Sequence, residues 1–106
     1  MAREQFQTLT EPMYYILLAL TQACCGVDIM DKVKLLSHGR VKVGPGTLYA
    51  MIAKFEENGV IIKTAEKGRR KSYIITDIGR DMLCREYERL KMMVEDGYGK
   101  IERLMT

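Results

Sequence analysis

The segment 43–60 holds the side chains whose types and spacing are best suited to binding chemistry. Leu48, Ile52 and Phe55 recur at spacings of four and three, which predicts a helix with one apolar face. Its opposite face carries a hydroxyl, a phenol, a small side chain and a cation, from Thr47, Tyr49, Ala50 and Lys54. Such groups can contact base edges or phosphates, so this segment is a candidate for a helix that enters a groove of DNA.

The ends of this candidate helix are marked in the sequence. Pro45 is tolerated in a first turn because the N–H that proline lacks would have no partner within the helix. Asn58 and Gly59 both tolerate the left-handed conformation that closes a helix, so we expect the helix to stop there.

Positive charge is concentrated around the same segment. Residues 32–73 hold ten Lys and Arg against three Glu, whereas residues 1–31 and residues 74–106 are each net acidic. A local basic field of this kind suits a polyanion, and nucleic acid is the usual one. The alternative is a solvated basic surface with no ligand.

A β-hairpin is predicted directly after the candidate helix, with strands at 60–66 and 71–76, where β-branched and aromatic residues are concentrated. Its turn carries four nearly consecutive cations: Lys67, Arg69, Arg70 and Lys71. These charges repel one another unless they are solvated or meet phosphates. The hairpin is therefore a candidate wing along the DNA backbone or minor groove, and the alternative is a solvated edge whose charges oppose aggregation.

Two further helices are expected ahead of the candidate helix. The first spans about residues 11–23, with Thr10 as its N-cap, and is apolar nearly all round, which predicts that a second chain helps to bury it. The second spans about residues 27–36. Its side chains expected toward the core are Ile29, Met30, Val33 and either Leu36 or Leu35. Two short helices, a turn and a helix with a polar outer face predict a helix-turn-helix.

A last helix of about 28 residues is predicted, with Thr76 and Asp77 at its start. A seam of four–three spacing runs along it, formed by Leu83, Tyr87, Leu90, Val94, Gly97, Ile101 and Leu104. This is coiled-coil spacing, and a helix of this length exceeds what so small a domain can cover. The simplest partner is a second copy of the chain, so we assign a dimer interface to Leu83, Tyr87, Leu90, Val94, Ile101 and Leu104. Gly97 and Gly99 predict a kink, a close crossing or an early end.

Enzymatic and metal-binding functions have little support in the sequence. His38 is the only histidine and lies in a predicted turn, and there is no phosphate loop, hydrolase elbow or metal signature, so we expect no enzyme, metal or cofactor. Cys24, Cys25 and Cys84 lack metal-ligand spacing, which favours free thiols in a reducing cytoplasm, with a redox switch as the alternative. The apolar run 13–20 is too short to span a bilayer, and no signal peptide is visible. We therefore expect a cytoplasmic protein.

Four sequence blocks resemble the PadR family of bacterial transcriptional regulators. They are LTEPMYYIL at 9–17, GTLY at 46–49, ENGVI at 57–61 and YIITDIGR at 73–80. The resemblance covers about residues 8–106 and fits a short form with one C-terminal helix. It implies a winged helix-turn-helix homodimer that binds palindromic operator DNA, usually as a repressor.

The resemblance also implies roles for individual residues. It places Pro45, Thr47 and Tyr49 at the DNA-facing start of the recognition helix, and the wing tip on Lys67, Arg69, Arg70 and Lys71. Lys42 and Lys54 are added to the DNA-binding set because of their charge and their helix face. The family often has a serine where this chain has Gly44, so we expect the helix start to lack a side-chain cap, and it often has an aromatic residue where this chain has Val27.

A sensor function is implied as well, because some members of the family bind aromatic or drug-like compounds at the dimer interface. The residues that match this role are aromatic, methionine and leucine side chains: Tyr14, Tyr15, Leu18, Met82, Met92 and Met93. Methionines adapt to varied apolar shapes and aromatic rings stack on planar ligands. Plain packing between helices is the alternative for each of them.

The predicted architecture is mainly α with a small β-hairpin wing (α+β), in one compact unit. Residues 1–76 form a winged helix-turn-helix DNA-binding domain, and residues 77–106 form a dimerisation helix. The predicted function is a sequence-specific regulator of transcription, a homodimeric repressor relieved by a small apolar or aromatic ligand. The alternative is a winged-helix module for protein–protein interaction that never touches DNA.

Overall fold

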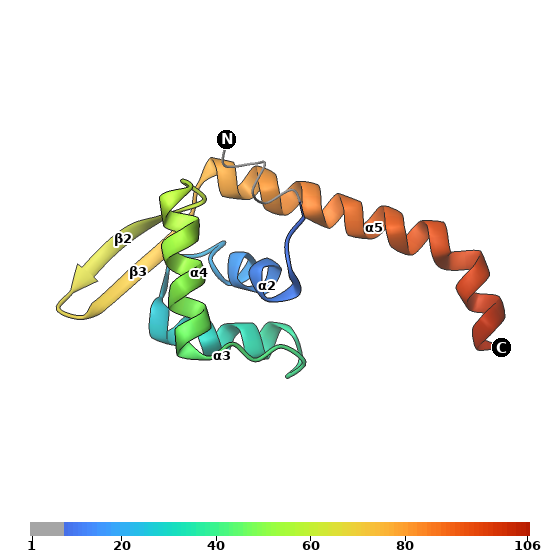
Figure 1. The fold of residues 1–106 in the computed structure, drawn as a ribbon, viewed down its shortest axis with the longest axis horizontal. Coiled ribbons are helices and arrows are strands. Elements are labelled where there is room, and N and C mark those ends of the chain that lie inside the picture. The colour runs from blue at the N-terminus through green and yellow to red at the C-terminus, as the bar shows by residue number, and fades with distance from the viewer. Residues whose placement is uncertain (1–7) are drawn as a thin grey trace.

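The computed structural model describes residues 8–106, so the first seven residues of the predicted 1–76 domain lie outside it. Within that range it holds four helices and a three-stranded antiparallel sheet (Figure 1). In chain order the elements are α2 (Glu11–Ala19), β1 (Cys24–Cys25), α3 (Gly26–Leu36), α4 (Pro45–Glu57), β2 (Ile61–Lys67), β3 (Arg70–Ile75) and α5 (Asp77–Met105). The predicted mainly α fold with a β-hairpin wing is confirmed.

The core lies between α2, α3, α4, the sheet and the first turns of α5. Its buried side chains include the predicted apolar face of α4, formed by Leu48, Ile52 and Phe55. These side chains share one cluster with Ile16 and Leu17 of α2. The four–three spacing of Leu48, Ile52 and Phe55 therefore predicted the buried face of α4 correctly.

The first helix is shorter than the sequence indicates. The Thr10 side chain caps it as predicted, accepting from the N–H of Met13 at 3.3 Å. It ends at Ala19, however, and the predicted continuation to residue 23 is wrong. The Leu20 carbonyl accepts from the N–H of Ile75 at 2.9 Å, so the chain leaves the helix to meet the sheet.

The core-facing residues of α3 correct a second prediction. Ile29 and Val33 are buried, but Leu35 and Leu36 are 78% and 45% exposed, so neither lies toward the core. The position four residues after Val33 is Ser37, which is fully buried. Its Oγ accepts from the N–H of Val41 at 2.9 Å, and this satisfied polar group ends the apolar face of α3.

The sheet has the order β1–β3–β2, with all neighbours antiparallel. The β2–β3 hairpin is the predicted wing, and it pairs Ile61 with Ile75 at its base and Lys67 with Arg70 at its tip. Strand β1 was not predicted. It is only two residues long and pairs Cys24 with Tyr73. Two residues are too few to show the alternating pattern by which a strand is predicted from sequence.

The start of α5 is locked against the end of α4. Thr76 caps the helix as predicted, and its hydroxyl accepts from the N–H of Gly79 at 3.2 Å. The same hydroxyl lies 2.6 Å from the Gly59 carbonyl oxygen, where it can donate. Gly59 has φ of 72°, the left-handed value expected at the end of α4. These contacts fix the direction in which α5 leaves the domain.

Beyond its first turns α5 extends away from the rest of the molecule (Figure 1). Its buried residues are Gly79, Met82, Leu83 and Glu86. From residue 87 to residue 106 every side chain is exposed or half-buried. The helix is continuous through Gly97 and Gly99, so the early end considered from the sequence does not occur.

Candidate nucleic-acid interface

The outer face of α4 is exposed along its length. Pro45 occupies the first turn, and the N-cap is Gly44, which makes no side-chain cap as expected. All five predicted DNA-binding positions on α4 and the segment before it are exposed: Lys42, Pro45, Thr47, Tyr49 and Lys54. A helix anchored by three buried side chains and polar on its other face can enter a major groove without loss of its core.

The segment between α3 and α4 holds α4 in place. His38 and Gly39 both have positive φ, 55° and 80°, and the Gly39 N–H donates to the Lys34 carbonyl at 2.8 Å. Val41 and Val43 are then buried in the core, while Lys42 between them is exposed. This alternation turns Lys42 outward next to the first turn of α4.

The wing presents its cations at the tip of the hairpin. Lys67, Arg69, Arg70 and Lys71 are all exposed. Arg70 forms an ion pair with Asp28 at the start of α3, with 3.8 Å between the guanidinium nitrogen and the carboxylate oxygen. The other ion pair on the hairpin joins Lys63 and Glu66 at 2.6 Å, near the bulge in β2. The tip therefore keeps a strong positive charge.

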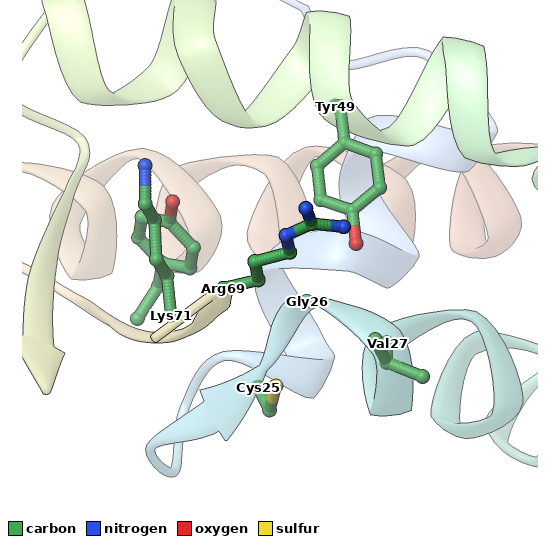
Figure 2. A pocket seen from close by; sticks show the side chains of 7 residues that line it. Cys25, Gly26, Val27, Tyr49, Arg69 and Lys71 are labelled. Carbon is green, nitrogen blue, oxygen red and sulfur yellow. The ribbon is translucent and has the colours of Figure 1, made fainter. Parts of the chain in front are cut away.

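A cavity of about 210 Å³ lies between the wing and α4, the predicted recognition helix. We call it the helix–wing cavity, and its walls are Cys25, Gly26, Val27, Tyr49, Arg69, Lys71 and Tyr73. Figure 2 shows Arg69 reaching from the wing toward the ring of Tyr49. The structure thus brings three predicted DNA-binding residues, Tyr49, Arg69 and Lys71, to one place.

The remaining walls of this cavity were missed from the sequence. Gly26 lies so close to Tyr49 that a Cβ added to it would be 3.1 Å from Cε1 and 3.2 Å from the hydroxyl oxygen. Cys25, Gly26 and Val27 are separated from Tyr49 by more than twenty residues in the chain, and no motif links them. Only the antiparallel pairing of β1 with β3 brings them to the wing.

The predicted dimer seam divides into two parts. Leu83 is buried in the core of its own chain, and Leu90 is half-buried. Tyr87, Val94, Ile101 and Leu104 are 51%, 70%, 50% and 81% exposed. These four side chains form an exposed apolar stripe along α5, and a stripe of this length is unusual on a folded monomer.

The predicted ligand residues do not all lie together. A second cavity, of about 260 Å³, is lined by Leu9, Glu11, Tyr14, Tyr15, Glu86, Arg89 and Leu90. We call it the tyrosine cavity. The rings of Tyr14 and Tyr15 are 5.7 Å apart in an edge-to-face arrangement. Leu18 lines a different hollow, Met82 is in the core, and Met92 and Met93 are exposed on α5.

Glu86 and Arg89, two charged residues that line the tyrosine cavity, are hydrogen-bonded to each other. The Glu86 side chain is 4% exposed, and its carboxylate accepts two hydrogen bonds from Arg89, at 2.7 and 2.8 Å. It also accepts from the N–H of Leu9 at 3.3 Å. The hydrogen bonds from Arg89 hold the pKa of Glu86 below its usual range, against the opposing effect of burial. At neutral pH the carboxylate is therefore charged.

Arg40 does not line the cavity, but it holds two residues that do. Its guanidinium donates to Glu11 at 2.9 Å and to the Tyr15 hydroxyl at 2.7 Å. Burial raises the pKa of Tyr14, the other phenol, so its hydroxyl is neutral at physiological pH. The cavity thus has aromatic walls with a carboxylate–guanidinium pair at one side.

The family model of the transcriptional regulator PadR-like family matches residues 16–85. The chain belongs to the PadR-like family of transcriptional regulators. PadR-type regulators bind DNA, are generally dimeric and are not enzymes. The matched span runs from within α2 to the first turns of α5, so it contains α3, α4 and the wing.

Several solved structures share this fold. A PadR-family regulator from Eggerthella lenta is 28% identical, with a TM-score of 0.64 over 83% of this chain and 78% of that one. RosR from H. salinarum is 21% identical, with a TM-score of 0.66 over 93% of this chain and 89% of that one. NadR in complex with 4-hydroxyphenylacetate is 16% identical, with a TM-score of 0.59 over 99% of this chain and 68% of that one.

A relative among curated proteins is an uncharacterised 37.1 kDa protein in a transposon of Streptomyces fradiae. It is 38% identical over 45 residues, which are 42% of this chain and 13% of that protein. The match therefore spans a small part of the relative's length.

The structure bears on other sequence predictions too. Cys24, Cys25 and Cys84 are free thiols, as expected. Among residues 8–106, no helix is long and apolar enough to cross a membrane, and no cluster of metal-ligating side chains is found.

Proposed function

We propose that this PadR-like regulator acts as a homodimeric, sequence-specific repressor in the cytoplasm of a bacterium. The observation that carries the proposal is the pairing of an exposed polar face on α4 with a cationic wing beside it. Each α4 enters a major groove, and each wing contacts the flanking backbone. Two such units in a dimer meet half-sites about one helical turn apart.

The dimer is supported by apolar surface that the single chain leaves uncovered. The distal seam of α5 is largely exposed, and Met13, Tyr14, Tyr15 and Leu18 of α2 are only half-buried against the core. A second copy packing its α5 along this surface would bury both. In this arrangement residues 77–106 serve as the dimerisation helix and residues 1–76 as the DNA-binding domain.

The proposal is tested by binding of the purified protein to a duplex selected from a random pool, measured at two salt concentrations with nonspecific duplex as competitor. We expect competitor-resistant binding of two chains per duplex and an affinity that falls steeply as salt rises. Lys67→Gln at the wing tip should lower affinity for all sequences alike and flatten the salt slope by about one unit. Absence of duplex binding even at low salt would favour the protein–protein module instead.

We also propose that a small aromatic effector binds in the tyrosine cavity and relieves repression. Support comes from its two tyrosine rings and from its position against α5, where an occupant would change how α5 packs on α2. The structurally similar NadR was solved in complex with 4-hydroxyphenylacetate, which is an aromatic acid. Arg89 and Arg40 provide cationic groups beside the rings.

Thermal unfolding with and without 4-hydroxyphenylacetate, followed by a panel of related phenols, tests the effector. A ligand at 100 times its dissociation constant stabilises the folded state by about 2.7 kcal/mol, so we expect a rise of several degrees in the melting temperature. Tyr14→Leu should abolish the rise, whereas Tyr49→Leu, outside the cavity, should keep it. An equal rise in both variants would place the ligand elsewhere.

A further inference from the structure

The helix–wing cavity is built by three separate elements. The start of α3 forms one wall through Gly26 and Val27, α4 contributes Tyr49, and the wing contributes Arg69 and Lys71 (Figure 2). The cavity therefore exists only while wing and recognition helix hold their present positions. A ligand bound in it would contact both.

The polar side chains that line the cavity are two cations, Arg69 and Lys71, two phenols, Tyr49 and Tyr73, and the thiol of Cys25. Arg69 and Lys71 carry positive charge and have no acceptor, and the Tyr49 hydroxyl can donate. The nearest acid on α3 is Asp28, and its carboxylate is paired with Arg70 at 3.8 Å. Two cations and phenol hydroxyls around one cavity that no carboxylate lines are suited to an anion with several oxygens.

The volume of the cavity limits the size of the anion that it can hold. A volume of about 210 Å³ is below the range of roughly 300–1,000 Å³ that is usual for sites of drug-sized molecules and cofactors. It has room for a phosphate group, whose oxygens can each accept a charge-assisted hydrogen bond. Because the cavity lies between the recognition helix and the wing, the phosphate nearest to it in a complex belongs to the DNA backbone.

Gly26 sets the position of the Tyr49 side chain. A Cβ at residue 26 would be 3.1 Å from Tyr49 Cε1 and 3.2 Å from its hydroxyl oxygen, which is tighter than ordinary contact. The ring rests directly on this glycine and is held on the side of α4 that faces the wing. A methyl group at position 26 would require the phenol to shift by a few tenths of an ångström, and a larger side chain would displace it further.

We propose that the helix–wing cavity binds one backbone phosphate of each DNA half-site, held jointly by Tyr49, Arg69 and Lys71, and that Gly26 is the positioning residue for Tyr49. The inference rests on the proposed DNA binding and makes it more specific. Tyr49 then contacts the backbone and fixes the register of α4, while base reading falls to the other exposed side chains of α4, including Thr47. Wing and recognition helix are coupled through one shared phosphate.

A double-mutant cycle tests the coupling. Tyr49→Phe removes the hydroxyl alone, and Arg69→Gln removes the cation; each should weaken binding to the selected duplex about tenfold, as expected for the loss of a charge-assisted hydrogen bond. Because both groups hold the same phosphate, the double variant should lose much less than the product of the two effects. Lys67→Gln combined with Tyr49→Phe is the matched control, since Lys67 lies outside the cavity, and its two effects should multiply.

Duplexes with a single neutral methylphosphonate, moved along each strand in turn, locate the phosphate. For the wild-type protein we expect one position per half-site at which neutralisation lowers affinity about tenfold. The Tyr49→Phe/Arg69→Gln variant should lose this sensitivity at that position, and the Lys67→Gln variant should retain it.

Gly26→Ala tests the positioning role. It should lower duplex affinity in the wild-type background and have no further effect when Tyr49 is replaced by alanine, with circular dichroism used to verify that each variant is folded. Multiplicative effects of Tyr49→Phe and Arg69→Gln would overturn the shared phosphate, and an unchanged affinity of a folded Gly26→Ala variant would overturn the positioning role of Gly26. Both outcomes would leave DNA binding intact. Failure of the wild-type protein to bind any duplex would overturn the proposed function and this inference with it.

Discussion

At the scale of single residues, Gly79 shows how closely α5 approaches the end of α4. A Cβ on this residue would overlap the Val60 carbonyl oxygen and lie 2.6 Å from Ile75 Cγ1. The Val60 oxygen belongs to the backbone and also accepts from the N–H of Thr76 at 2.9 Å, so it cannot move aside cheaply. Gly79 is therefore required by packing, which gives a physical reason for the glycine in the block at 73–80.

Replacing Gly79 with alanine should destabilise the protein by about 2–3 kcal/mol, because a methyl group must be forced into a filled space. Urea unfolding at fixed protein concentration measures the loss. Gly99→Ala is the matched control on the same helix, since its Cβ would meet open space, and it should be neutral or stabilise by up to about 1 kcal/mol. Similar losses in both variants would contradict the packing explanation.

Thr76 combines two roles in one hydroxyl, as acceptor for the Gly79 N–H and as donor toward the Gly59 or Val60 carbonyl. Thr76→Val keeps the shape and removes both roles, so we expect a loss of about 1–2 kcal/mol in the free energy of unfolding. Thr47→Val, at an exposed position of α4, should change stability by less than about 0.5 kcal/mol. The same urea series compares the two.

At the scale of elements, Glu86 joins α5 to the segment before α2. Its carboxylate is buried, accepts from the Leu9 N–H and is paired with Arg89. Since the pKa of Glu86 is lowered in the folded state, folding favours the charged carboxylate. This contribution is complete above the ordinary glutamate pKa of about 4.3, and it is lost as pH falls through the lower pKa of the folded protein.

Glu86→Gln keeps an acceptor for the Leu9 N–H but removes the charge that Arg89 binds. At pH 7 we expect a destabilisation of about 1–2 kcal/mol. As the pH falls below about 4 the difference from wild type should shrink, because the wild-type carboxylate becomes protonated. Unfolding curves between pH 7 and pH 3 follow the difference, and a gap that stays constant over this range would exclude the charge as its cause.

At the scale of the whole molecule, α5 extends beyond the domain and its distal seam is exposed. The overall extents of 55 × 32 × 21 Å reflect this arm. Exposing apolar side chains of a protruding helix to water costs free energy. Packing against the same seam of a second copy would remove this cost. The proposed dimer follows from this shape.

Val94 is 70% exposed at the middle of the seam, so Val94→Glu should leave the domain folded and convert the dimer to a monomer at micromolar concentration. Sedimentation velocity measures the mass, and duplex binding should weaken because a monomer holds one half-site. Lys100→Glu places the same charge on α5 outside the seam and should remain dimeric. A dimeric Val94→Glu variant would show that association uses another surface.

Local sequence signals determined much of the fold. The spacing of Leu48, Ile52 and Phe55 set the buried face of α4, Thr10 and Thr76 marked helix starts, and Gly59 marked a helix end, because each of these depends on chemistry within a few residues. The cationic turn likewise identified the wing. These signals need no information about distant parts of the chain.

Tertiary structure decided what local signals could not. The end of α2 at Ala19, the burial of Ser37 in place of Leu35 or Leu36, and the placement of Leu83 in the core all depend on partners elsewhere in the chain. The helix–wing cavity is the clearest case. Its walls come from α3, α4 and the wing, and pairing of the two-residue strand β1 with β3 brings them together. Contacts between distant segments leave no periodic trace in the sequence, so only the folded chain shows that Gly26 supports Tyr49.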